Sequence, residues 1–297
     1  MTESKKADLL HRYLFEDHHV RGELVQISDA FSEMLKNHNY PNVVKRILGE
    51  LLSATSLLTA TLKFEGDISV QIQGDGPLSY AVVNGDHNQT MRAVAKYAED
   101  IQEGTVQDLI GSGFMVITIA PEGGERYQGV AALDKPTLAE CIEEYFETSE
   151  QLKTRVWLAT DVNDQQCSTA GMLLQVLPVE EKAKQDFVHL EALTNTITDK
   201  ELLELDPEQV LIRLYHEDNP QMFQPQPISY NCGCSREKTG NAILKLAYDD
   251  AKALVEERGN IEITCQFCLT QYEFDEIDVE AIFRGTNGLE NDTDNVN

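Results

Sequence analysis

Residues 67–83, DISVQIQGDGPLSYAVV, show the clearest strand pattern in the chain. Isoleucine and valine alternate with polar residues in the first half, and this two-residue period is typical of a strand buried on one face. The central GDGP at 74–77 consists of turn-forming residues, and an apolar run follows it at 78–83. The segment therefore predicts a β-hairpin.

The residues on either side of this hairpin predict a mixture of strands and helices. Strands are expected at 90–95, 114–119, 127–132, 155–159 and 172–176, with the second and third of these forming another hairpin. Helices are expected at 41–62, where apolar residues recur at helical spacing, and at 137–146. Because these elements do not alternate regularly as strand, helix, strand, we expect an α+β fold.

The pattern changes at Pro178, and residues 179–227 contain only helical signals. Thr198 and Glu201 have capping-box spacing, and Asp206 with Pro207 begins a further helix. Helices this short are marginal alone, so their apolar faces must pack on a neighbour. We predict an α+β core domain in residues 1–178, a metastable helical linker in 179–227, a zinc-binding domain in 228–285 and a disordered acidic tail in 286–297.

Charge and hydropathy limit the classes of partner. The 297 residues include 24 Lys and Arg against 51 Asp and Glu, a net charge of −27, which repels a nucleic-acid backbone. The first residues are polar, and no apolar run is long enough for a signal peptide or a membrane span. We therefore expect a cytoplasmic protein that binds neither nucleic acid nor membrane, whose cysteines serve as metal ligands or redox groups.

Four of the six cysteines form two tight pairs. The sequence YNCGC at 230–234 is separated from CQFC at 265–268 by a stretch that predicts two short helices and a strand. Four thiolates suit tetrahedral Zn²⁺, and Gly233 permits a sharp bend between the first two. The spacing predicts one zinc ion per chain, bound by Cys232, Cys234, Cys265 and Cys268. A unit of about 60 residues depends on such a metal, which contributes about 10–16 kcal/mol in small zinc peptides.

The spacing alone leaves several functions open. A purely structural zinc site has the same ligand pattern, because most four-cysteine sites are inert. A thiol–disulfide oxidoreductase that uses Cys265 and Cys268 is less favoured, because such motifs usually open a helix and these flanks predict strands. A zinc ribbon that binds nucleic acid is disfavoured by the lack of a basic stripe.

The remaining candidate residues receive structural interpretations. Cys141 is interpreted as a small buried apolar residue of the helix at 137–146. Cys167 lies in a polar loop or at a strand start, its exposure is left open, and neither Cys141 nor Cys167 has a partner at ligand spacing or an assigned role. His18 and His19 are adjacent, and adjacent side chains rarely converge on a metal, so a surface turn is predicted there.

Several motifs together resemble one protein family. Its zinc domain is matched by Tyr-x-Cys-x-Cys-Ser at 230–235, Cys-x-Phe-Cys at 265–268 and Tyr-x-Phe at 272–274. GELL at 49–52, QGDGPL at 73–78, AG at 170–171 and QVLP at 175–178 resemble the same family's N-terminal domain. Over nearly its full length, the chain thus resembles the 33-kDa redox-regulated heat-shock chaperones.

The resemblance implies a mechanism rather than an enzyme activity. The reduced, zinc-bound form is expected to be inactive. Oxidants with mild heat are expected to join Cys232 with Cys234 and Cys265 with Cys268, to expel zinc and to unfold the small domain. The active form is then a dimer that holds unfolding proteins without ATP, under oxidative and heat stress.

The same reasoning predicts where client proteins bind. Collapse of the linker would expose the apolar residues that pack its helices. The candidates are Phe187, Leu190, Leu193, Leu211 and Leu214. Ordinary helix packing explains each of them equally well.

Overall fold

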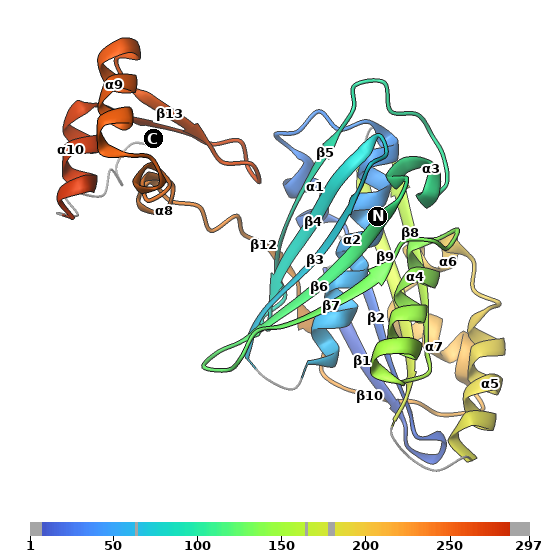
Figure 1. The fold of residues 1–297 in the computed structure, drawn as a ribbon. Coiled ribbons are helices and arrows are strands. Elements are labelled where there is room, and N and C mark those ends of the chain that lie inside the picture. Colours follow the sequence, from blue (N-terminus) through green and yellow to red (C-terminus); the bar gives the residue numbers. More distant parts are fainter. Residues whose placement is uncertain (1–7, 63–64, 164–165, 178–181, 286–297) are drawn as a thin grey trace, which may run out of the picture. The chain divides into compact units, whose positions relative to one another are not determined.

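The computed structural model describes residues 8–62, 65–163, 166–177 and 182–285 (Figure 1). The chain forms two compact units that divide between Asn231 and Cys232. We call the part up to Asn231 the first unit and the part from Cys232 the second unit. Both contain strands and helices, and the expected α+β fold is confirmed.

The first unit contains two six-stranded sheets. The first sheet has the order β10-β1-β2-β9-β8, with β11 also pairing with β1. All of its pairings are antiparallel. Its strands are β1 (Leu9–Phe15), β2 (Val20–Ile27), β8 (Thr154–Val162), β9 (Cys167–Val176), β10 (Gln221–Met222) and β11 (Gln226–Pro227). Strand β1, which the sequence pattern does not predict, thus connects the N-terminal region to residues near 221–227.

The second sheet has the order β12-β5-β4-β3-β6-β7. The hairpin predicted at 67–83 is confirmed as β3 and β4, with Val70 opposite Val83, and the hairpin of β6 and β7 is confirmed as well. The last strand, β12, pairs in parallel with β5. The strands are β3 (Gly66–Gly74), β4 (Leu78–Asp86), β5 (Thr90–Tyr97), β6 (Gly113–Pro121), β7 (Tyr127–Ala132) and β12 (Ser229–Tyr230).

Helix α2 (Asn42–Thr61) lies between the two sheets and contacts strands of both (Figure 1). Its apolar residues are buried on nearly every side, which explains why the predicted helix is hydrophobic over most of its length. Gly49 allows this close packing, because a Cβ atom there would lie 2.6 Å from Cγ2 of Thr160. The main core of the first unit therefore lies between the sheets.

Three short helices cover the opposite face of the first sheet. They are α5 (Lys182–Thr194), α6 (Asp199–Glu204) and α7 (Pro207–Tyr215), and we call them the helical layer. Thr198 forms the predicted capping box with Glu201, and Asp206 caps α7. The Gln26 side chain donates hydrogen bonds to the Leu202 and Leu205 carbonyls at 2.6 and 2.8 Å, tying α6 to the sheet.

Five shorter elements complete the described part of the first unit. Thr137 caps α4 as predicted, through a capping box with Glu140. The residues at the β1–β2 connection form a single tight turn, as expected for the two adjacent histidines. The elements are the turn η1 (Glu16–His18), α1 (Asp29–Leu35), α3 (Val106–Ile110), α4 (Leu138–Tyr145) and the π-helical turn η2 (Phe146–Glu150).

The second unit has a small core of its own. Its elements are α8 (Arg236–Gly240), η3 (Ile243–Lys245), α9 (Tyr248–Arg258), the hairpin β13 (Ile261–Thr264) and β14 (Gln271–Phe274), and α10 (Glu276–Arg284). The buried apolar side chains are Ile243, Ala251, Val255, Phe274 and Val279. The Arg236 guanidinium lies 4.7 Å from the centroid of the Phe274 ring and forms an ion pair of 2.6 Å with Asp278.

The predicted division into core domain, linker, zinc domain and tail stays a prediction. The linker start at residue 179 and the tail at 286–297 lie outside the described residues. Within the first unit, the strands at 221–230 belong to its two sheets. Of the predicted linker, helices α5, α6 and α7 pack on one face of the first sheet, and β10 and β11 pair with β1 at its edge.

Candidate metal centre

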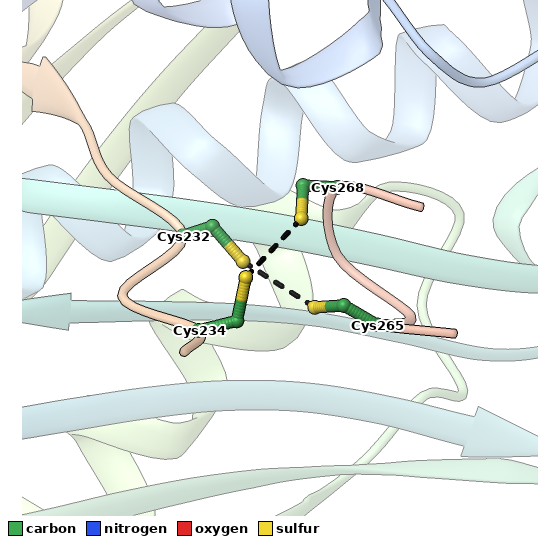
Figure 2. A group of neighbouring side chains, drawn as sticks. All are labelled: Cys232, Cys234, Cys265 and Cys268. Atoms are coloured by element: carbon green, nitrogen blue, oxygen red, sulfur yellow. Dashed lines mark hydrogen bonds between the residues drawn. The ribbon is translucent and has the colours of Figure 1, made fainter. Parts of the chain in front are cut away.

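The four paired cysteines lie together in the second unit. One sulfur from each of Cys232, Cys234, Cys265 and Cys268 lies within 4.8 Å of the other three (Figure 2). The Sγ atoms of Cys232 and Cys265 are 3.4 Å apart, as are those of Cys234 and Cys268. A tetrahedral zinc site with Zn–S bonds of about 2.3 Å places its sulfurs about 3.8 Å apart. The four free thiols therefore suit one zinc ion.

The first cysteine pair is positioned by a bend at Gly233. Its φ angle is +63°, in the left-handed region that glycine adopts without strain. The Lys238 ammonium donates a hydrogen bond of 2.8 Å to the Gly233 carbonyl, and Ser235 caps α8 by accepting from the Lys238 amide. The bend turns both sulfurs toward the same point.

The second pair lies in the turn between β13 and β14. The Cys265 amide donates to the Thr270 carbonyl, and the Leu269 amide donates to the Cys265 carbonyl, each at 2.9 Å. Leu269 adopts a left-handed φ of +59°, which reverses the chain within a few residues. Cys268 therefore lies on the same side of the turn as Cys265 (Figure 2).

Two hydroxyl groups form hydrogen bonds with the sulfurs. Tyr272 Oη lies 3.1 Å from Cys234 Sγ, and Thr270 Oγ1 lies 3.2 Å from Cys268 Sγ. Burial opposes ionisation of Cys268, but hydrogen bonds with Thr270 and with the thiols of Cys234 and Cys232 outweigh it and lower the pKa of that thiol to about 7. Burial raises the pKa of Cys232 and Cys234. A bound cation would favour the thiolate at all four positions.

The sulfurs differ in their access to solvent. Cys232 is almost completely buried, whereas Cys234, Cys265 and Cys268 are half-buried. Oxidants attack the thiolate form of cysteine, and they reach it most easily where the sulfur is partly exposed. The cluster therefore combines a zinc-type ligand set with access for small oxidants.

The two other cysteines, Cys141 and Cys167, belong to the first unit. Cys141 is fully buried in α4, as predicted. Cys167 stands at the start of β9, one of its two predicted placements, and only 8% of its surface is exposed. Strand β9 begins five residues before the predicted strand, and Cys167 pairs there with Val162 and packs into the main core.

The predicted client-binding residues lie in the helical layer. Phe187, Leu190, Leu211 and Leu214 are buried against the first sheet, and Leu193 is partly buried there. The structure thus brings the five side chains into one apolar cluster. In this arrangement they serve as core contacts, and their role with clients stays a prediction.

Comparison with known proteins identifies the family. A family model described as Hsp33 protein matches residues 8–275. The chain belongs to the Hsp33 family. The 33 kDa chaperonin of Pseudoalteromonas translucida (strain TAC 125) is 58% identical over 279 residues, which cover 94% of this chain and 99% of the relative. That of Serratia proteamaculans (strain 568) is 50% identical over 282 residues, 95% and 97% of the two chains.

A solved Hsp33 structure shares the fold. The crystal structure of the 33 kDa chaperonin of Thermotoga maritima superimposes with a TM-score of 0.84 and 22% identity, covering 94% of this chain and 99% of that one. Membership of the Hsp33 family supports a chaperone function for this chain. Within the residues that the structure describes, no helix is long and apolar enough to cross a membrane.

Proposed function

We propose that this Hsp33-family chain is a redox-regulated, ATP-independent chaperone that holds unfolding proteins and prevents their aggregation under oxidative and heat stress. The supporting observation is the four-sulfur cluster in a unit whose described residues, 232–285, bury five apolar side chains in a core of their own. Zinc binding of about 10 kcal/mol outweighs what so small a core supplies. Redox control of the sulfurs would thus control the folding of the unit.

In the reduced state, Cys232, Cys234, Cys265 and Cys268 would hold one Zn²⁺. The ion would supply positive charge that keeps the four thiols deprotonated and cross-links the two turns. The hydroxyls of Tyr272 and Thr270 orient two of the sulfurs. This is the inactive form in our proposal.

Oxidation would remove all four ligands. With peroxide as oxidant, two thiolates give up two electrons to form one S–S bond, the O–O bond breaks, and two protons complete two water molecules. We propose that Cys232 joins Cys234 and Cys265 joins Cys268. Disulfide sulfur is a poor zinc ligand, so the second unit would lose its metal and its order.

Release of the helical layer would then provide the client-binding surface. The proposed linker, residues 179–227, carries Phe187, Leu190, Leu193, Leu211 and Leu214, which together form a contiguous apolar face in this structure. Exposed patches of this kind bind unfolded chains. We further propose that the active form is a cytoplasmic homodimer with no enzyme activity and no nucleic-acid or membrane partner.

Two other functions have weaker or less specific support. A purely structural zinc site is supported by the same cluster and differs only in what oxidation does. A thiol–disulfide oxidoreductase is less supported, because Cys265 and Cys268 lie in a turn between two strands rather than at the start of a helix.

The deciding experiment measures zinc release and chaperone activity together. The reduced, zinc-loaded full chain is compared with the same protein treated with peroxide at mild heat, in a light-scattering assay with a heat-unfolded test protein and no ATP. We expect release of about one zinc per chain together with suppression of aggregation. Release without suppression would leave a structural zinc site and overturn the chaperone mechanism.

A matched control variant distinguishes the role of the four-cysteine cluster from that of the other two cysteines. Cys167→Ala removes a thiol that is not a ligand and should keep the full response. Replacement of Cys265 and Cys268 by serine should prevent zinc retention in the reduced protein. If Cys167→Ala instead abolishes activation, the four-cysteine cluster is not the switch.

Peptide mapping of the oxidised protein tests the pairing. We expect disulfides within each motif, Cys232 with Cys234 and Cys265 with Cys268. In the reduced structure, by contrast, the sulfur pairs that lie 3.4 Å apart belong to different motifs: Cys232 contacts Cys265, and Cys234 contacts Cys268. Recovery of these cross-linked peptides would contradict the proposed pairing.

A further inference from the structure

A cluster of two histidines and two aspartates joins three segments of the first unit. His18 on η1 lies between Asp186 of α5 and Asp218, which follows α7. Its Nδ1 is 3.4 Å from Asp186 Oδ2, and its Nε2 is 3.3 Å from Asp218 Oδ1. His189 of α5 places its Nε2 3.2 Å from the same Asp218 oxygen.

The cluster lies where the helical layer meets the β1–β2 turn. The Asp218 side chain is 8% exposed, so its carboxylate is largely removed from water and needs donors from the protein. The neighbouring Phe15 and Tyr215 rings belong to the apolar cluster beneath the layer. The His18 ring therefore fastens both α5 and the end of α7 to the sheet.

The position of His18 requires a particular protonation state. A neutral imidazole has one N–H group, so it donates to one carboxylate and turns a lone pair toward the other. Only the imidazolium can form an ion pair with Asp186 and Asp218 together, because both of its ring nitrogens carry a proton. Histidine changes its charge between about pH 5 and 8, so both states are accessible to the protein.

Several other charged groups of the packed elements pair elsewhere. Glu191 of α5 pairs with Arg155 and Lys153, and Arg213 of α7 pairs with Glu201. His216 pairs with its neighbour Glu217. The described titratable side chains of η1, α5, α7 and their flanks are Glu16, Asp17, His18, His19, Asp186, His189, Glu191, Glu208, Arg213, Tyr215, His216, Glu217 and Asp218.

We propose that His18 is a proton-dependent clasp for the helical layer. When protonated, it holds Asp186 and Asp218 and keeps α5 and the end of α7 on the sheet. When neutral, it releases one of the two carboxylates, and the layer opens more readily. Rising pH thus loosens the layer, whatever the state of the cysteines.

Hydrogen exchange of the reduced full chain tests the clasp without a chaperone assay. Amide protection of residues 185–194 and 215–219 is measured from pH 5.5 to 8.5, corrected for intrinsic exchange, in the native protein and in His18→Asn. At pH 5.5 we expect the native protein to be about tenfold better protected there than the variant. At pH 8.5 the two should differ by less than about twofold.

Two further variants keep the test decisive. Asp186→Asn removes one acceptor at a partly exposed position and should also abolish most of the pH-dependent protection. His216→Gln changes a histidine outside the clasp and should behave like the native protein, and protection of α2 serves as an internal reference. Equal protection of the native protein and both clasp variants at pH 5.5 would overturn the proposal.

Discussion

The cores of the two units differ in scale. The first unit buries the facing sides of two sheets and nearly all of α2, while the second buries only five apolar residues. Burial stabilises by about 25 cal/mol per Å² of apolar surface, so the larger core holds the first unit together without a cross-link. The second unit has the four-cysteine cluster instead. The difference shows how one part of a chain can unfold while another stays folded.

Zinc removal should break the second core and leave the first intact. With a chelator under reducing conditions, residues 232–285 should lose their protection from hydrogen exchange, because about 10 kcal/mol of metal binding is withdrawn. The β-strands of the first unit should keep theirs, and re-addition of zinc should restore the second unit. Persistent protection of β13 and β14 after chelation would show that the small core is self-sufficient.

A large-to-small substitution in each core sharpens the same contrast. Leu51→Ala and Phe274→Ala each truncate a fully buried side chain and should cost about 3–5 kcal/mol. The first unit should stay folded with a lower unfolding midpoint. In the second unit the loss should appear as a zinc affinity at least about a hundredfold weaker, because binding and folding are coupled.

The control for this pair is Ile277→Ala. Ile277 lies on α10 in the second unit and is 78% exposed, so its truncation should leave the zinc affinity unchanged. A competition titration with a chromogenic chelator measures all three variants. An unchanged affinity for Phe274→Ala would mean that the zinc site forms without the apolar core.

The first core should also respond to pH through Glu23. Burial raises the pKa of this carboxyl to about 7, which the nearby arginines only partly offset. The pKa of Glu23 in the folded protein exceeds the unfolded value of 4.5, because burial penalises the ionised carboxylate. The protonated carboxyl therefore makes its full contribution to stability below about pH 4.5, and this contribution is lost as the pH rises through 7. The loss amounts to about 3 kcal/mol at most.

Urea unfolding followed by the fluorescence of Trp157, the single tryptophan, measures this effect in the first unit. Glu23→Gln should remove the decline in stability between pH 5 and 8. Glu33→Gln, which changes an exposed carboxyl on α1, should retain it. A decline of equal size in Glu23→Gln would assign the pH dependence to other groups.

Substitutions at helix caps should change stability least, and their consequences should again differ between the two units. Thr198→Ala in the helical layer and Asp275→Ala in the second unit each remove one side of a capping box, at about 1 kcal/mol. Thr198→Ala should increase the hydrogen exchange of α6 and leave the zinc affinity of the second unit unchanged. Asp275→Ala should weaken zinc binding about fivefold, and equal zinc affinities for both variants would contradict the coupling.

Local patterns along the chain predict much of this protein. The two-residue period at 67–83, the capping box at Thr198 and the cysteine spacing each depend on residues close in sequence. The α+β fold, both hairpins of the second sheet and the four-cysteine cluster follow from such patterns. Gly233 is one example of a residue whose conformation follows directly from its motif.

Other features arise only from contacts between distant segments. Strand β1 has a sequence that does not alternate clearly, and it forms because β2, β10 and β11 pair with it. Cys167 is buried because β9 extends further along β8 than its polar residues indicate. Such pairings depend on partners that no local period describes.

The sequence by itself determined which four cysteines cluster, where most of the helices and strands lie, and to which family the chain belongs. The tertiary structure alone decided that Glu23 is buried and that His18 lies between Asp186 and Asp218. The physical reason is distance along the chain. Burial and ion pairing depend on which remote residues surround a side chain, whereas turns, caps and metal-binding motifs are set by near neighbours.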